Sequence, residues 1–179
     1  MQSWGPMRAA ITTASGVELQ LHELDPDEDG ELVHREFNRI LAAGEGYPQA
    51  GPIDYEEFRE YWVDHKSAVV VATRTDGEFA GSYYLKPNGY GRAAHVANAG
   101  YFVVAEHRGL GAGEALVRHS IELAVELGFD ALQFNFVFES NPAVRLYERL
   151  GFSVVGRVPD VIDGEAVLIY WRSLKEDAG

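Results

Sequence analysis

The sequence predicts an α/β protein whose mixed central sheet, of about seven strands, carries helices on both faces. Segments rich in β-branched and aromatic residues alternate with segments whose apolar residues recur at helical spacing. Two Asp-Gly pairs, at residues 76–77 and 163–164, separate strand-like runs and predict tight hairpins. With 179 residues, 46% of them hydrophobic, the chain can bury one sizeable core. We therefore expect a flexible N-terminal tail over residues 1–13 and a single domain over residues 14–175.

Composition and charge exclude several classes of function. The chain has no cysteine, so it contains neither a disulfide nor a thiolate that could bind a metal or act as a nucleophile. Its formal net charge of −13 disfavours nucleic-acid binding, which depends on neutralising phosphates. No segment resembles a signal peptide or a membrane-spanning run. We expect a soluble cytoplasmic protein whose partner is a small molecule rather than a nucleic acid or a membrane; a homodimer stays open.

The first half of the chain predicts a strand, two helices and a hairpin. The strand alternates strictly between apolar and polar residues, and both helices carry apolar residues on one face. In order, these elements are a strand over residues 17–24, a helix from residue 25 to residue 44, a loop over 44–52, a helix from residue 54, and hairpin strands over 67–75 and 78–85.

An acidic segment before the first helix has two interpretations. The EF-hand calcium pattern is matched at Asp25, Asp27, Asp29, Gly30 and Glu36. The alternative is a helix that Asp25 caps and Pro26 opens, with acidic side chains stabilised by the helix dipole. The preceding segment alternates like a strand, whereas an EF-hand needs a helix there, and no second calcium loop follows. We therefore predict a helix cap and no metal site.

A strand, a glycine-rich loop and a helix follow one another over residues 95–127. The strand covers residues 95–104, and the helix runs to Gly128 with apolar residues on one face. Glycines at the start of a helix let a phosphate approach free backbone N–H groups, and an arginine adds a charged donor. The sequence fits neither the Walker pattern nor the dinucleotide-binding fingerprint. It predicts a phosphate-binding loop formed by Arg108, Gly109, Leu110, Gly111, Ala112 and Gly113.

The last third of the chain predicts a strand, a short helix and a second hairpin. Over residues 131–138 we expect Leu132, Phe134, Phe136 and Phe138 on one face, with Gln133, Asn135, Val137 and Glu139 on the other. Asn141 is the expected N-cap of a helix that Gly151 ends. The final hairpin pairs residues 153–161 with 166–171.

Two motifs in this order resemble the GNAT family of N-acetyltransferases. They are R-x-x-G-x-G from Arg108 and N-x-x-x-x-x-Y-x-x-x-G-F from Asn141. The resemblance covers residues 17–174 and implies the GNAT fold, with acetyl-coenzyme A as co-substrate. It implies that the backbone of Phe102, Val103 and Val104 pairs with the pantetheine arm, that Asn141 also contacts this arm, and that the loop from Arg108 to Gly113 holds the pyrophosphate.

The family chemistry is direct attack of an amine on the thioester, with the coenzyme leaving as a thiolate. A phenol with a pKa near ~10 can protonate that thiolate, and Tyr147 occupies the position of the family's general acid. The alternative for Tyr147 is an aromatic side chain that only packs the fourth helix against the sheet. Three residues are open as general base: Glu139, His95 and Glu45. No side-chain base is needed if the acceptor amine is already partly neutral.

Further stretches resemble the fungal acetyltransferases that act on azetidine-2-carboxylate and other proline analogues. They lie at residues 44–49, 84–88, 98–101 and 134–141. The resemblance implies an acceptor site formed by Asn98, Tyr101 and Asn135. Neutral amides can bind a carboxylate and an amine together. We expect an N-acetyltransferase for a small amine or imino acid; a non-catalytic coenzyme A sensor and a protein N-terminal acetyltransferase are the alternatives.

Overall fold

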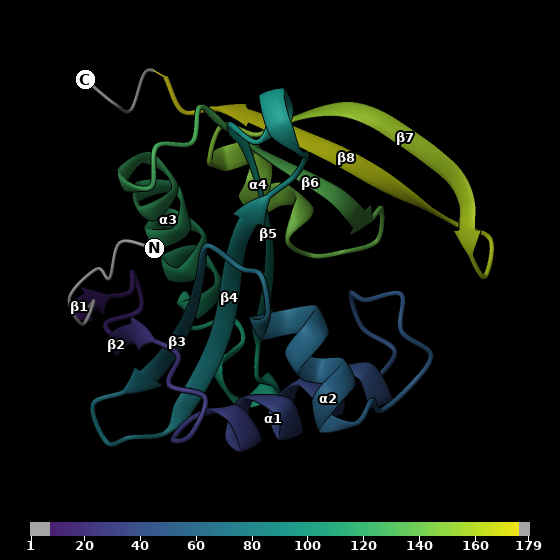
Figure 1. The fold of residues 1–179 in the computed structure, drawn as a ribbon. Coiled ribbons are helices and arrows are strands. Elements are labelled where there is room, and N and C mark those ends of the chain that lie inside the picture. The colour runs from purple at the N-terminus through teal and green to yellow at the C-terminus, as the bar shows by residue number, and fades with distance from the viewer. Residues whose placement is uncertain (1–7, 176–179) are drawn as a thin grey trace.

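The structure, a computed structural model, describes residues 8–175 and contains one eight-stranded mixed sheet (Figure 1). Its strands are β1 (Arg8–Thr12), β2 (Glu18–Glu23), β3 (Ala68–Arg74), β4 (Phe79–Pro87), β5 (Val96–Val103), β6 (Ala131–Phe138), β7 (Ser153–Ile162) and β8 (Glu165–Ser173). They lie in the order β1-β2-β3-β4-β5-β6-β8-β7. All neighbours are antiparallel except β5 and β6, which are parallel. The predicted mixed α/β sheet is confirmed.

The N-terminal tail is shorter than predicted. Residues 1–7 lie outside the described part of the chain, but Arg8–Thr12 forms β1, which pairs antiparallel with β2. Ala9 and Ile11 pack against the core, which accounts for the extra strand. The prediction of a tail is therefore wrong for residues 8–12.

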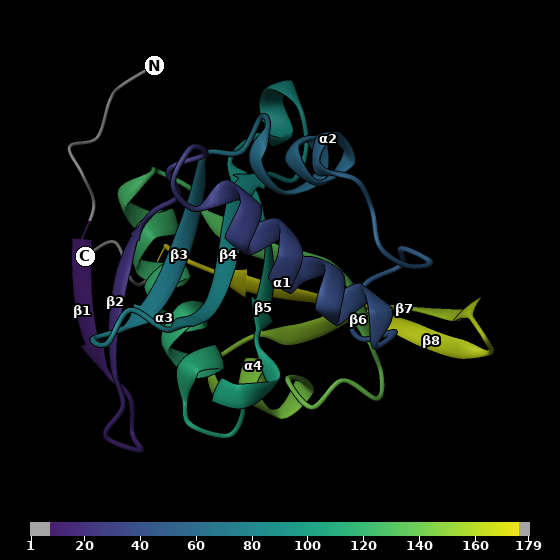
Figure 2. The same cartoon turned by 90° about the horizontal axis from the view of Figure 1, so that it is seen from below.

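Helices cover both faces of the sheet, as predicted (Figures 1 and 2). On one face lie α1 (Gly30–Ala42) and α2 (Tyr55–Phe58), the latter continued by a π-helical turn over Arg59–Val63. On the other lie α3 (Ala112–Glu126) and α4 (Val144–Arg149). No described helix is both long and apolar enough to cross a membrane.

Each face of the sheet has its own apolar core. Under α1 and α2, the aromatic rings of Phe37 and Trp62 lie 5.0 Å apart, and Trp62 contacts Tyr84 and Phe102 at 4.9 and 5.1 Å between ring centres. The core under α3 and α4 is mostly aliphatic and includes the fully buried Leu116. The sheet is therefore packed on both sides, as in an α/β protein.

The acidic segment forms a turn ahead of α1. The Asp25 carboxylate accepts hydrogen bonds from the N–H groups of Asp27 and Glu28, at 2.9 and 3.4 Å. The helix begins at Gly30, so the predicted start at Pro26 is one turn too early, and Asp25 caps the turn rather than α1 itself. Glu36, the last residue of the calcium pattern, is buried and pairs with Arg35 and Arg39. Within residues 8–175, no three His, Cys, Asp or Glu side chains come together to hold a metal ion.

A bulge in β6 corrects the predicted face of that strand. Leu132 and Phe134 lie in the α3/α4 core as expected, but the register shifts between Phe134 and Val137. Beyond the bulge the alternation is reversed, so Val137 is buried in that core while Phe136 is only partly buried. The prediction is therefore wrong for Phe136, Val137 and Phe138, and the rings of Phe136 and Phe138 pack on each other outside that core.

Removal of calcium should leave the stability of the protein unchanged. A dedicated calcium site would raise the free energy of unfolding by ~2.7 kcal/mol at a hundredfold excess over its dissociation constant. Because Glu36 is engaged by two arginines, we expect equal melting temperatures in millimolar calcium and in chelator. A saturable rise in melting temperature that Asp27→Ala and Glu36→Ala both abolish would contradict this interpretation.

Candidate cofactor and acceptor site

The two central strands, β5 and β6, pair only at their beginnings. The register matches Val96 with Ala131 and Ala97 with Leu132, and no later pair forms between the two described strands. One residue further on, the side-chain amide of Asn98 donates a 2.9 Å hydrogen bond to the carbonyl of Gln133. The strands therefore part from Asn98 onward and leave a gap in the middle of the sheet.

Alternate residues of β5 direct their backbone N–H and C=O groups into this gap. The Val104 N–H donates to the Ala80 carbonyl of β4 at 3.1 Å, and the Val104 carbonyl accepts from the His107 N–H at 3.0 Å. Because successive residues of a strand direct their backbone groups to opposite sides, Phe102 also faces β4, whereas Tyr101 and Val103 face the gap. Of the three residues expected to offer backbone groups to a pantetheine arm, only Val103 is oriented to do so.

Beyond β5, the glycine-rich loop leads into the N-terminus of α3. A 3-10 turn over Ala105–His107 precedes the loop, and Gly109 and Gly111 have φ values of +73° and +87°. The first bond within α3 joins the Ala115 N–H to the Gly111 carbonyl, so the N–H groups of Ala112, Gly113 and Glu114 have no partner within the helix. This geometry suits an anion. A Cβ at Gly111 would lie 2.9 Å from Thr13 Cβ, so packing also requires glycine there.

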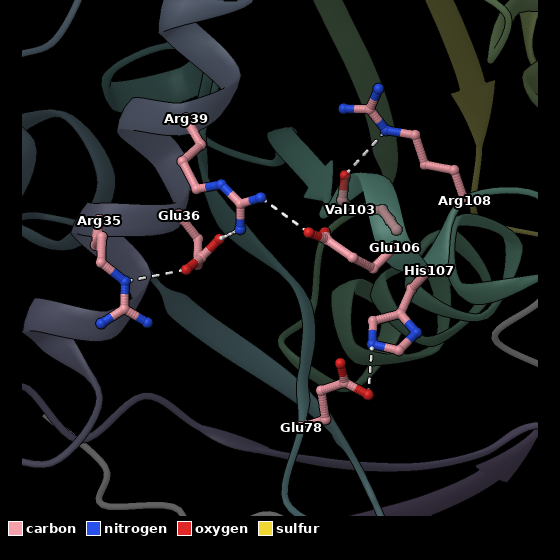
Figure 3. A network of polar contacts seen from close by, with 8 residues as sticks. All are labelled: Arg35, Glu36, Arg39, Glu78, Val103, Glu106, His107 and Arg108. Carbon is pink, nitrogen blue, oxygen red and sulfur yellow. Dashed lines mark hydrogen bonds and ion pairs between the residues drawn. The ribbon is translucent and has the colours of Figure 1, made fainter.

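Arg108 joins this loop to the carbonyl of Val103 in the gap (Figure 3) and to Glu45 in the segment 44–52. Its Nε donates to the Val103 carbonyl at 3.2 Å, and its Nη2 lies 2.6 Å from a carboxylate oxygen of Glu45. In the same region Arg39 connects Glu36 with Glu106. The guanidinium of Arg108 thus already binds an anion, which Glu45 supplies.

Tyr147 lies on α4 under the gap, in an aromatic cluster. Its ring centre lies 4.8 Å from that of Phe134, 5.7 Å from that of Tyr170 and 5.9 Å from that of Phe152. Burial, followed by the proximity of Tyr170, raises the pKa of Tyr147 well above its usual value. The Phe152 N–H binds the Tyr147 carbonyl at 3.0 Å across the left-handed Gly151, which fixes the end of α4. The phenol is therefore neutral and held in place.

Asn141 lies between β6 and α4. Its side-chain oxygen accepts from the Ala143 N–H at 2.9 Å, and its carbonyl accepts from the Val144 N–H at 3.0 Å. The helix begins at Val144 with Ala143 as its N-cap, so Asn141 caps the turn before α4 rather than the helix itself.

The two asparagines predicted for the acceptor site lie on the same face of the sheet as α1 and α2. Asn98 is opposite Lys86 in the register of β4 and β5 and is mostly buried. Asn135 donates to Asn88 and accepts from Gln133 at 2.8 Å. The residues at the opening of the gap therefore form a network of neutral amides.

Tyr101, the third predicted acceptor residue, points to the other face. Its ring packs against Phe134, with centres 5.7 Å apart, and its hydroxyl lies 2.7 Å from the Ser120 hydroxyl of α3. Only its carbonyl faces the gap, where it accepts a 2.7 Å hydrogen bond from the Tyr47 hydroxyl. The structure therefore does not bring the Tyr101 side chain together with Asn98 and Asn135, because adjacent strand residues alternate between faces.

The three candidates for general base all have other partners. Glu139 forms two hydrogen bonds with Arg157, at 2.8 and 2.9 Å, and these lower the pKa of its carboxyl group. His95 is exposed, and its Nδ1 lies 2.9 Å from the Arg92 carbonyl. Glu45 pairs with Arg108. The geometry favours none of them as a base.

Several residues around the gap have no pattern in the sequence that predicts a role for them. Tyr47 packs its ring on Phe37 at 4.9 Å, and burial, followed by the neighbouring phenols, raises its pKa well above the usual value. The Nζ atoms of Lys66 and Lys86 both lie close to the Tyr84 ring, at 5.3 and 5.8 Å from its centre. The stretches containing Tyr47 and Lys86 were part of the resemblance, but single charged or aromatic residues in loops carry no distinctive spacing.

A parted central sheet beside a glycine-rich helix N-terminus, whose first N–H groups have no partner within the helix, is an arrangement that suits a long phosphorylated ligand. A model of the acetyltransferase (GNAT) family matches residues 31–152. The chain belongs to this family. It is similar to the N-acetyltransferase aca1 of Schizosaccharomyces pombe, with 40% identity over 81 residues, which are 45% of this chain and 39% of that protein. The match thus spans about two fifths of the length of that relative.

Solved structures share the fold. A GCN5-related N-acetyltransferase from Kribbella flavida matches with a TM-score of 0.80 at 35% identity, over 87% of this chain and 97% of that one. A phosphinothricin acetyltransferase from Sinorhizobium meliloti, in complex with acetyl-coenzyme A, matches with a TM-score of 0.78 at 18% identity, over 93% of this chain and 90% of that one. The predicted GNAT fold is confirmed.

Gly100→Ala should destabilise the protein, because the ring of Tyr84 lies directly over Gly100. An added Cβ would lie 2.6 Å from Tyr84 Cε1, and the ring cannot retreat easily because Trp62 lies 4.9 Å behind it between ring centres. We expect a loss of ~1–3 kcal/mol in the free energy of unfolding, measured by urea denaturation. Gly113→Ala is the control, since its Cβ would meet nothing closer than Val103 Cγ2 at 3.9 Å. Equal stability of both variants would contradict this packing.

Proposed function

We propose that the protein is an N-acetyltransferase that uses acetyl-coenzyme A as co-substrate and acetylates the amine of a small molecule. The observation that carries this proposal is the gap that opens between β5 and β6 at Asn98 and leads to the glycine-rich N-terminus of α3. A pantetheine arm is long and narrow and carries amides, so it suits a gap edged by backbone groups. Family membership and the complex of the Sinorhizobium meliloti enzyme with acetyl-coenzyme A support the same ligand.

The residues that would hold the coenzyme lie along one line. The backbone groups of Tyr101 and Val103 would bind the arm, with Asn141 beside it. The phosphates would bind the N–H groups from Gly109 to Gly113 and the guanidinium of Arg108. Acetyl-coenzyme A supplies an activated acetyl group as a thioester. The chain positions the coenzyme. Ligand groups would replace Glu45 as the partner of Arg108 and Tyr47 as the partner of the Tyr101 carbonyl.

Tyr147 would deliver the proton that the leaving thiolate needs. Its buried phenol has a raised pKa and therefore stays protonated at any ordinary assay pH. The ring of Tyr147 lies against Phe134, which in turn packs on the ring of Tyr101, so Tyr147 and Tyr101 belong to one aromatic cluster.

The acceptor would be an amino acid or imino acid such as a proline analogue. Neutral amides from Asn98 and Asn135 can bind a carboxylate and an uncharged amine at once without holding the nucleophile as a cation. The phosphinothricin acetyltransferase among the similar structures is named for a small molecule of this kind.

Two other functions are less well supported. A peptide N-terminal acetyltransferase needs an open groove, but the segment 44–52 crosses the gap and Tyr47 is bonded to Tyr101. A non-catalytic sensor would bind coenzyme A without releasing thiol. The experiment that separates these functions measures free thiol while acetyl-coenzyme A is supplied with amines, cyclic amino acids and peptides. Release with small acceptors alone is the expected result.

Tyr147→Phe should lower turnover by roughly 10²–10⁴-fold with little change in coenzyme affinity. The substitution removes the proton donor but keeps the ring in its aromatic cluster. The thiol-release assay and calorimetry with acetyl-coenzyme A measure the two effects separately. Turnover within a few-fold of the parent would show that Tyr147 only packs α4 against the sheet.

Glu45→Gln should tighten the binding of acetyl-coenzyme A, and Arg108→Ala should weaken it. Glu45 competes with the ligand phosphates for Arg108, but the pair is partly exposed, so its removal should improve affinity by about fivefold at most. Loss of the Arg108 contact should weaken affinity by about tenfold or more. Glu106→Gln is the control, because Glu106 pairs with Arg39 instead. An unchanged dissociation constant in both test variants would remove Arg108 from the phosphate site.

A further inference from the structure

Two of the three lysines in the chain lie at a single aromatic ring. The lysines are Lys66, Lys86 and Lys175. The Nζ atoms of Lys66 and Lys86 lie 5.3 and 5.8 Å from the centre of the Tyr84 ring. Cations at this distance from a tyrosine face are stabilised by the ring, but two of them also repel each other. Such a pair needs an explanation in a protein that has few lysines.

Neither ammonium group has a carboxylate partner among residues 8–175, although the chain carries 28 acidic residues. The Lys66 Nζ donates to the backbone carbonyls of Asp64 and Glu60, at 2.9 and 3.3 Å. The Asp64 carboxylate itself is paired with Arg59 at 3.2 Å. By contrast, Lys175 lies 3.8 Å from a carboxylate oxygen of Asp130. The two lysines at Tyr84 are therefore a concentrated positive charge with unused donor capacity.

The surroundings of Lys66 destabilise its charged form. Burial, followed by the proximity of Lys86, lowers the pKa of Lys66 to about 8. The Asp64 carboxylate, which is paired with Arg59, opposes this shift but is the smallest of the three effects on the pKa of Lys66. An anion bound between the two ammonium groups would add to that opposition, because it brings a negative charge into a partly desolvated place. This is the local electrostatic arrangement of an anion site.

The pair lies beside the amide network of the gap and far from the phosphate-binding loop. Lys86 is opposite Asn98 across β4 and β5, Tyr84 is opposite Gly100, and Asn88 binds Asn135. Residues directly opposite in an antiparallel pair share a face, so Lys86 and Asn98 are neighbours on the α1/α2 side. The five steps along β5 from Asn98 to Val103 span about 17 Å, so the phosphates held after β5 are out of reach of this pair.

We propose that Lys66 and Lys86 form an anion subsite that binds the carboxylate of the acceptor, with Tyr84 as its floor. The inference rests on the proposed acetyltransferase function and adds the group by which the enzyme selects its acceptor. The carboxylate lies between the two ammonium groups, and the acceptor amine points along the asparagines toward the gap. Acceptors without an acidic group lack this contact.

Matched acceptors test the subsite through turnover. Azetidine-2-carboxylate and its carboxamide differ only in the charge of the group that the lysines bind. We expect the parent to prefer the acid and Lys66→Gln or Lys86→Gln to raise the KM for the acid by about 10- to 100-fold while changing kcat little. Lys86→Arg should retain the preference, and Lys175→Gln should leave all constants unchanged. A preference for the acid that survives both glutamine substitutions would overturn the inference.

Binding tests the subsite without turnover. Selective lysine labelling gives three side-chain signals by NMR, one for each lysine of the chain. In the presence of coenzyme A, which carries no acetyl group, azetidine-2-carboxylate should shift the signals of Lys66 and Lys86 but not that of Lys175. The carboxamide should shift none of them. Equal responses to both compounds would contradict a carboxylate site.

The two measurements separate failure of the subsite from failure of the enzyme assignment. Thiol release with no preference between acid and amide leaves the acetyltransferase function in place and removes the subsite. Absence of thiol release with every acceptor removes the acetyltransferase function. In that case the lysine signals alone decide whether Lys66 and Lys86 bind a carboxylate.

Discussion

The separation of β5 from β6 after two paired residues is the constraint on which the rest of the structure depends. Buried backbone groups must find partners, so a parted sheet is stable only if other elements satisfy the exposed strand edges. Asn98 marks the end of hydrogen bonding between these two strands, because its side-chain amide binds the Gln133 carbonyl in place of a backbone partner. Beyond it, the Tyr47 hydroxyl and the Arg108 guanidinium satisfy the carbonyls of Tyr101 and Val103. The groups that stabilise the gap are thus the groups that a ligand in the gap must replace.

The replacement of these internal partners by ligand groups would couple the gap between β5 and β6 to the glycine-rich loop. Tyr47 and Glu45 belong to the same short segment, and they bind the middle of β5 and the start of the glycine-rich loop at the same time. A ligand that took Arg108 from Glu45 would therefore also release one of the polar contacts that hold this segment. The segment is anchored elsewhere by the ring of Tyr47, which packs between Phe37 and Trp62. Its displacement is therefore a local rearrangement of polar contacts rather than an unfolding of the core.

Much of the fold follows from the sequence, because the spacing of apolar residues and the residues that favour tight turns are local properties of the chain. The Asp-Gly hairpins and the strand–loop–helix unit around Arg108 lie where the pattern predicted them. The errors arise where a distant partner decides. Residues 8–12 form a strand only because the edge of β2 accepts them, and Val137 turns inward only because pairing with β8 forces a bulge. The prediction for the Tyr101 side chain is wrong for a related reason. The stretch from Asn98 to Tyr101 alternates between the two faces of the sheet, and Tyr101 points to the face covered by α3.

The charges around the gap also bear on why a general base is hard to find. Glu139 and His95 are engaged by other groups, and Glu45 pairs with Arg108 until a ligand displaces it. A positive charge near an ammonium group disfavours the protonated form and lowers its pKa. Lys66 and Lys86 would therefore act on the acceptor twice, once by binding its carboxylate and once by promoting loss of a proton from its amine. Neutral asparagines nearby would receive that amine without restoring its charge. In such a site the acceptor amine would lose its proton to water before the attack, and no side-chain base would be needed.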